Sequence, residues 1–106
     1  MTAPLHLSGV VLPEGEHRDL WVRDGRITFE PVPGAETVSR GGWLLPGLVD
    51  AHCHVGIAKG GGHVEDLAHA RAQALTEREA GVLALRDCGS PVDTRALDDE
   101  PDLPRI

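Results

Sequence analysis

Two histidines separated by a single residue, His52 and His54, are the side chains best suited to chemistry in this sequence. They end an apolar segment, residues 48–54, that follows a Pro-Gly pair and predicts a short buried β-strand. Side chains two residues apart on a strand share one face and lie about 6.5–7 Å apart, so Asp50, His52 and His54 are predicted to point the same way. Two imidazoles on one strand can bind a single ion at about 2.0–2.1 Å from each nitrogen. The spacing predicts half of a metal site, with His52 and His54 as the ligands.

The alternative interpretation of this pair is purely structural, and three features of the surrounding sequence favour the metal site. The pair ends a strand, which is where α/β folds bind ligands. Asp50 is expected on the same face, where a carboxylate can orient an imidazole. A glycine-rich loop, residues 55–62, follows directly and can shape the mouth of a pocket. Zinc is the first candidate for the ion, with iron, manganese or nickel as alternatives, since imidazole binds several transition metals.

The elements that must position this pair fall on either side of Pro46. Residues 5–45 predict only β-strands, and an Asp-Gly pair at 24–25 predicts a tight hairpin, because both central residues of that turn need positive φ. After Pro46, the strand that carries the histidines is followed by a predicted helix over residues 65–80 and by a wholly apolar run, residues 82–85. An uninterrupted apolar run is typical of a parallel strand covered on both faces. Strand, helix and strand in this order predict one βαβ unit with a right-handed crossover.

Other polar side chains near the predicted strand ends have weaker claims to a chemical role. Cys53 alternates away from the histidines, so we expect it to pack under a helix instead of binding metal. Cys88 has no visible base partner, so a nucleophilic role is not expected. Two roles are open for Asp87: it either orients a metal-binding side chain in the pocket without binding the ion itself, or it binds amides of its own loop. Two histidines before and on the predicted helix are expected to be exposed: His63 and His69.

The composition argues against several classes of function. The 106 residues carry a formal net charge of −7, and the ten Lys and Arg are scattered, so no basic stripe is available to meet nucleic-acid phosphates. No stretch approaches the roughly 20 apolar residues of a membrane span, and the first residues lack the basic start of a signal peptide. The two cysteines are too few for a disulfide framework and are expected to be free thiols. We therefore expect a cytoplasmic protein with neither a nucleic-acid nor a membrane partner.

Two segments of the sequence resemble a known family. Residues 42–54, Gly-Trp-Leu-Leu-Pro-Gly-Leu-Val-Asp-Ala-His-Cys-His, resemble the start of the metal-dependent amidohydrolase superfamily. Residues 81–90, Gly-Val-Leu-Ala-Leu-Arg-Asp-Cys-Gly-Ser, resemble the second barrel strand and its loop in the branch that contains imidazolonepropionases and prolidase-like amidohydrolases. Residues 5–45 resemble the β-rich N-terminal segment of that family. The resemblance spans nearly the whole chain, and its Pro-Gly-Leu-Val-Asp-x-His-x-His block is the most specific part.

The resemblance implies an α/β fold class. Residues 1–46 are expected to form the N-terminal part of a small β-sandwich, and residues 47–106 the first βαβ unit of a (β/α)₈ TIM barrel. A complete barrel takes about 250 residues, so the barrel is expected to be incomplete, with its remainder supplied by further sequence or by a homo-oligomer partner. In the family the first-strand His-x-His binds the more buried metal, which again implies His52 and His54 as metal ligands. The remaining family residues, a carboxylated Lys, two His and an Asp on later strands, have no counterpart here; Lys59 is not expected to be that lysine, and no catalytic residue is assigned.

The function implied by the resemblance is hydrolysis of a C–N bond in a small substrate, either a cyclic amide or a dipeptide-like molecule. A metal-activated water would attack the carbonyl in the full-length enzyme, and this chain alone is expected to be inactive. The main alternative is a non-catalytic truncated product, or a metal-binding fragment that assembles with a partner chain. A third interpretation is another His-x-His metal hydrolase, such as a phosphoesterase, which the β-rich segment before residue 46 argues against.

Overall fold

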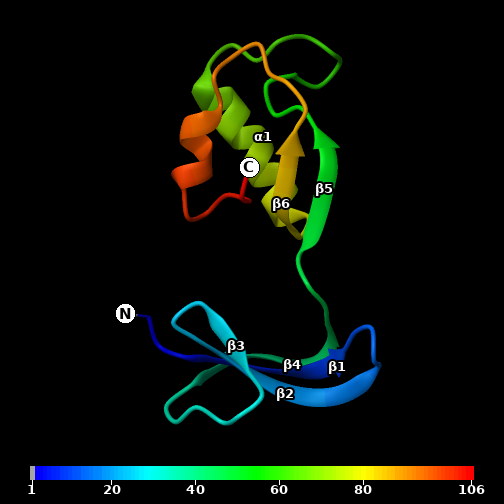
Figure 1. Ribbon diagram of the computed structural model, residues 1–106, viewed down its shortest axis with the longest axis vertical. Coiled ribbons are helices and arrows are strands. Elements are labelled where there is room, and N and C mark those ends of the chain that lie inside the picture. The colour runs from blue at the N-terminus through cyan, green and yellow to red at the C-terminus, as the bar shows by residue number, and fades with distance from the viewer. Residues whose placement is uncertain (1) are drawn as a thin grey trace. The chain divides into compact units, whose positions relative to one another are not determined.

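The computed structural model describes residues 2–106, which divide into two compact units (Figure 1). The first unit ends at Pro46, and the second covers Gly47–Ile106. The first unit is built from four strands: β1 (Leu5–Val11), β2 (Glu16–Arg23), β3 (Arg26–Thr28) and β4 (Glu36–Leu44). The second unit is built from two strands, one α-helix and one short 3₁₀ helix: β5 (Leu48–Cys53), α1 (Leu67–Glu79), β6 (Val82–Asp87) and η1 (Arg95–Asp99).

The first unit is a single four-stranded sheet with the order β3-β2-β1-β4. β1 pairs with β2 in the antiparallel sense and with β4 in the parallel sense. The hairpin between β2 and β3 confirms the turn predicted at the Asp-Gly pair, since Asp24 has φ 51° and Gly25 has φ 73°. That turn sets the register in which Arg23 lies opposite Arg26.

The first unit buries few apolar side chains. Leu20 and Val32 are its buried hydrophobic residues among those described, whereas Ile27, Val38 and Trp43 remain half-exposed or more. A unit of 46 residues with so few buried apolar side chains removes little apolar surface from water, so its own core contributes only modestly to stability.

The second unit has a denser core, formed where α1 packs against the strand β6. β5 and β6 pair in parallel, and α1 lies between them in the chain, as Figure 1 shows. The buried side chains come from the loop after β5, from α1, from β6 and from the C-terminal residues: Val55, Val64, Ala70, Ala74, Val82, Leu85, Leu97 and Leu103. The end of β5, which carries the histidine pair, is thus attached to the best-packed part of the chain.

The helix predicted over residues 65–80 is confirmed as α1, with ends two residues and one residue inside the predicted bounds. Asp66 precedes its first residue, and the carboxylate of Asp66 accepts the backbone N–H of His69 at 2.9 Å and so caps the first turn. The helix ends before Gly81, which has φ 96° and permits the sharp turn into β6. Among the described residues, no helix is long and apolar enough to cross a lipid bilayer.

The expected fold class, an α/β fold with a β-sandwich segment and the first unit of a TIM barrel, is wrong. Residues 2–106 are mostly strands with one α-helix and two small sheets, and no barrel unit is evident in them. The first unit is one sheet rather than two packed sheets, and β5 and β6 form an isolated pair extended only by a single bridge from Arg105 to Ala84. The apolar runs of β5 and β6 misled the prediction, because both faces of a barrel strand are buried whereas Val49 and Leu83 are 68% and 48% exposed.

Candidate metal centre

The two histidines converge at the end of β5. His52 belongs to the strand, and His54 follows its last residue, Cys53. Their Nε2 atoms lie 3.2 Å apart, with ring centroids at 5.1 Å and ring planes at 68° to each other. Both residues are exposed. The structure therefore brings together the two residues that the sequence assigned to metal binding.

The donor set fits a tetrahedral ion such as zinc. Two nitrogens that bind one tetrahedral ion at about 2.0–2.1 Å each are about 3.3 Å apart, and the separation here is 3.2 Å. Neutral imidazole is a preferred ligand for zinc and for several other transition metals. The Nε2 atoms of His52 and His54 are thus spaced like two ligands of one tetrahedral ion.

The hydrogen bond of His54 to the main chain decides which of its nitrogens is available. Its Nδ1 lies 2.8 Å from the carbonyl oxygen of Gly89, in the loop after β6. A carbonyl oxygen only accepts, so Nδ1 carries the proton and Nε2 keeps its lone pair. Without metal, Nε2 of His52 must then be the donor in the 3.2 Å contact with His54. Metal binding would displace that proton of His52, while His54 is already in the ligand form.

Asp50 does not orient an imidazole as expected. Its carboxylate accepts the backbone N–H of His52 at 3.1 Å, and it lies within 4.8 Å of the side-chain ligand atoms of Cys53 and Glu77. The pairing of β5 with β6 is irregular between Asp50 and Cys53, and an irregular ladder interrupts the strict alternation of side chains. The Asp50 carboxylate thus binds the backbone of the strand and makes no hydrogen bond to either imidazole.

Cys53 packs against the core of the second unit, as expected. Burial, together with the charges of Asp50, Glu77 and Asp87, raises the pKa of the Cys53 thiol to about 11. Asp50, Cys53 and Glu77 bring their side-chain ligand atoms within 4.8 Å of one another, and exposed acidic groups often gather in this way without an ion. Cys53 and Cys88 are both free cysteines.

A hollow lies beside His54 in the second unit. It encloses about 420 Å³ between the loop after β5 and the outer face of α1. Gln73 closes its base by donating to the carbonyl oxygens of Val55 and Ile57 at 2.7 and 2.8 Å. Lys59 and Glu77 also line the hollow, so both signs of charge are present next to the histidine pair.

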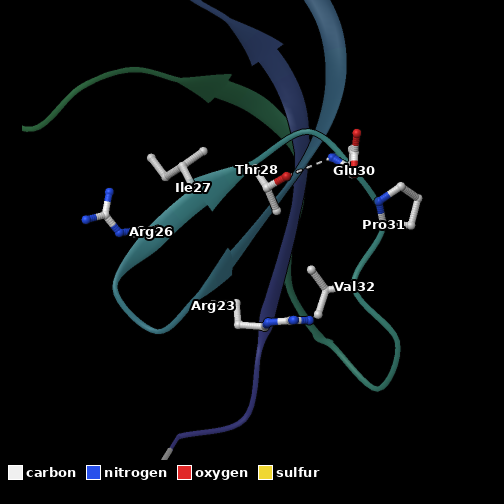
Figure 2. A pocket seen from close by; sticks show the side chains of 7 residues that line it. All are labelled: Arg23, Arg26, Ile27, Thr28, Glu30, Pro31 and Val32. Carbon is white, nitrogen blue, oxygen red and sulfur yellow. Dashed lines mark hydrogen bonds between the residues drawn. The ribbon is translucent and has the colours of Figure 1, made fainter.

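A second hollow lies in the first unit, around the β2–β3 hairpin and the segment that follows it (Figure 2). Figure 2 shows Arg23 reaching toward Val32, whereas Arg26 points out from the hairpin. The hydroxyl of Thr28 accepts the backbone N–H of Glu30 at 3.1 Å, which stabilises the bend after β3. No histidine or cysteine lines this hollow, so it offers none of the nitrogen and sulfur ligands found at the end of β5.

Two residues that matter to the histidine pair were missed by the sequence analysis. Gly89 supplies the carbonyl for His54, and Thr94 donates its hydroxyl to the carboxylate of Asp87 at 3.1 Å. An Asp-x-Gly sequence is a signal for a local turn, and it could have identified the loop of Asp87 and Gly89. No sequence signal indicates that this loop meets His54, because the contact joins residues 35 positions apart.

Comparisons with known proteins identify relatives without a stated activity. No protein-family model matches the chain. The chain is 64% identical over 102 residues to uncharacterized proteins of Mycobacterium bovis and of two strains of Mycobacterium tuberculosis. The match covers 96% of this chain but 27% of each relative. The chain therefore spans about a quarter of the length of the curated relatives it matches, and the activity of the whole protein is a matter for proposal.

Proposed function

We propose that His52 and His54 hold a divalent metal ion, with zinc as the first candidate, in a metal-dependent amidohydrolase. The observation that carries this proposal is the 3.2 Å approach of the two Nε2 atoms, with the other nitrogen of His54 bonded to a carbonyl. The resemblance of residues 42–54 to the start of the amidohydrolase superfamily supports the choice of reaction. The substrate would be a small molecule with a C–N bond, such as a cyclic amide or a dipeptide-like compound.

The chain's own residues would bind and orient the ion in this function. His52 and His54 would be its ligands, and the Gly89 carbonyl keeps the ring of His54 in the form that can bind. A bound metal lowers the pKa of a water molecule and polarises a carbonyl oxygen. No residue among 2–106 is assigned as the general base, so this chain alone is proposed to be inactive.

The ligand count indicates that further protein completes the centre. A catalytic zinc ion takes about three protein ligands and a water molecule. Within residues 2–106, no third His, Cys, Asp or Glu groups its ligand atom with those of His52 and His54. The further ligands would come from the part of a longer protein that corresponds to the unmatched length of the relatives, or from a partner chain.

A non-catalytic role is the second candidate, and the exposure of the pair favours it. Two exposed imidazoles without a third ligand bind metal loosely, as in a fragment that gains its activity or stability only on assembly with a partner chain. We also propose a cytoplasmic location, since both cysteines are free thiols.

The deciding experiment uses the full-length relative of Mycobacterium tuberculosis in metal-free and zinc-loaded forms. Hydrolysis of a panel of cyclic amides and dipeptides is followed by release of the free amine or acid. We expect zinc-dependent hydrolysis that disappears when the residues matching His52 and His54 are replaced by Ala. Zinc binding without hydrolysis of any compound in the panel would favour the non-catalytic role, and absence of zinc binding would reject the metal centre altogether.

A further inference from the structure

We propose that Asp87 is a positioning residue that keeps the proton of His54 on Nδ1 and so leaves Nε2 free. The inference deepens the proposed metal centre and rests on it for its functional meaning, although the position of the proton is a property of the metal-free chain. It follows from a continuous set of hydrogen bonds that runs from a buried threonine to the histidine ring.

The carboxylate of Asp87 uses both of its oxygens. One oxygen accepts the backbone N–H of Gly89 at 3.0 Å, and the other accepts the hydroxyl of Thr94 at 3.1 Å. Of the two roles that the sequence left open for Asp87, the structure shows the binding of an amide in its own loop. The same hydrogen bond also affects His54, because Gly89, whose N–H it binds, presents its carbonyl to the His54 ring.

The threonine end of this set is anchored in the core. Thr94 is 8% exposed, and its carbonyl accepts the backbone N–H of Leu97, which is 1% exposed. A hydroxyl held in this way fixes the carboxylate that it contacts. Asp87 is thereby attached to the best-packed region of the second unit rather than to a free loop.

The glycine end of the set depends on an unusual backbone conformation. Gly89 has φ 136°, which side-chain-bearing residues rarely adopt. A Cβ built at this position meets no atom within 4 Å, so conformation rather than space requires glycine there. The neighbouring amide of Cys88 donates to the carbonyl of Cys53 at 2.8 Å, which ties the loop to the residue just before His54.

The chemical consequence is selection of one form of the imidazole. A neutral histidine can carry its proton on either nitrogen, and the hydrogen bond made by one nitrogen decides what the other presents. The Gly89 carbonyl accepts only, so a loop held by Asp87 selects the form of His54 with a lone pair on Nε2. Without Asp87, the amide of Gly89 loses its acceptor, and of the two backbone N–H bonds described above only the one from Cys88 to Cys53 still holds the loop beside the ring.

The first measurement is the protonation of the imidazole nitrogens of His54 by ¹⁵N NMR in the metal-free chain. We expect the wild-type ring to carry its proton on Nδ1, and Asp87→Ala to give a mixture of both forms. Asp87→Asn retains an oxygen that can accept the Gly89 N–H and is expected to preserve the wild-type form. The matched control is Asp93→Ala, because Asp93 lies in the same loop and its carboxylate contacts only Arg95.

The second measurement is zinc affinity by calorimetry in the same variants. Loss of a group that orients a metal-binding histidine weakens metal binding about 10- to 100-fold, so we expect Asp87→Ala to fall in that range. Asp87→Asn and Asp93→Ala are expected to stay within about twofold of wild type. If Asp87→Ala does not fold, Gly89→Ala replaces it, since it displaces the carbonyl without changing charge.

The outcomes separate this inference from the proposed function. If His54 of the wild-type protein carries its proton on Nε2, the inference is overturned. It is also overturned if Asp87→Ala and Gly89→Ala both keep the proton position and the zinc affinity of the wild type. The expected NMR result without zinc binding in the wild type would reject the metal centre while the positioning role of Asp87 stands.

Discussion

His6 in the first unit and the His52–His54 pair in the second unit show how the same side chain serves two purposes. Both nitrogens of His6 are used inside the protein, by the hydroxyl of Thr37 at 2.9 Å and by the carboxylate of Asp19 at 2.7 Å. Its ring also stacks on Trp21 with centroids 4.9 Å apart, and its side chain is 15% exposed. In the exposed pair, the Nε2 atoms of His52 and His54 instead lie 3.2 Å from each other, and Nδ1 of His54 meets the carbonyl oxygen of Gly89.

The difference between His6 and the His52–His54 pair lies in what contacts the second ring nitrogen of each histidine. A histidine whose two nitrogens both meet protein groups has nothing left for an ion, so it holds a sheet together. A histidine whose one nitrogen is held by a carbonyl presents the other in a defined state. The first unit has few buried apolar side chains and benefits from the structural histidine, whereas the second unit has a core that can support an exposed pair.

The largest expected effect is on metal binding. Replacing His54 by Ala removes a proposed ligand, so zinc affinity measured by calorimetry is expected to fall by more than the 10- to 100-fold typical of lost supporting groups. His6→Ala is the control and is expected to leave zinc affinity within about twofold, because neither of its nitrogens is free. A loss of affinity in His6→Ala equal to that in His54→Ala would break the comparison.

The next effect is on stability, and here the His6 variant is expected to show the loss. His6→Ala removes the hydrogen bond to Thr37 and the stacking on Trp21, so the free energy of unfolding in urea is expected to fall by about 1–2 kcal/mol. The exposed His17 on β2 is the matched control, and His17→Ala is expected to change stability by less than about 0.5 kcal/mol. Equal losses in the two variants would mean that the His6 contacts contribute nothing specific.

A smaller effect concerns the dependence of stability on pH. The hydrogen bond from His6 holds the pKa of Asp19 below its usual value. A carboxylate with a lowered pKa in the folded state adds stability above its unfolded pKa, and that stability is lost as the pH falls through the folded value. On acidification from about pH 5 to about pH 2, the urea midpoint of the wild type should therefore fall more steeply than that of Asp19→Asn.

This pH effect is expected to be modest because Asp19 is half-exposed and water screens the interaction. Parallel acid titrations of the wild type and of Asp19→Asn, each followed by tryptophan fluorescence, measure it directly. Superimposable curves would show that the His6–Asp19 contact does not contribute to folding.

The smallest expected effect tests whether the imidazoles alone bind the ion. Cys53 packs against the core of the second unit, and among residues 2–106 its sulfur is not grouped with the ligand atoms of His52 or His54. Cys53→Ser is therefore expected to change zinc affinity at neutral pH by less than about twofold. A tenfold loss of zinc affinity in Cys53→Ser would show that the Cys53 thiolate is a metal ligand, so that the imidazoles do not bind the ion alone.

The local elements of this chain were predictable because their signals lie within a few residues. The Asp-Gly pair at 24–25 predicts a turn that only positive φ values allow, and the hairpin forms there. The helix over residues 67–79 follows from a run of strong helix formers that ends before a glycine. The His-x-His spacing predicts that two rings can meet, and their nitrogens do approach each other at the end of β5.

The fold class was not predictable in the same way. An apolar run indicates that a segment can be buried. It does not indicate how many strands lie beside that segment or whether helices cover both of its faces. Residues 82–85 were therefore expected to be covered on both faces in a barrel. Their parallel pairing with β5 agrees with the predicted strand-helix-strand unit, but Leu83 is half-exposed.

The sequence by itself determined the turn at residues 24–25, the helix, and the presence of two imidazoles on one strand end, because each depends on neighbouring residues and on backbone geometry. Only the tertiary structure decided that Asp50 turns toward Cys53, where the strand pairing is irregular. It also decided that a carbonyl 35 residues away meets Nδ1 of His54. A proton on a histidine is placed by whatever acceptor the fold brings to it, and such long-range contacts leave no trace in local residue patterns.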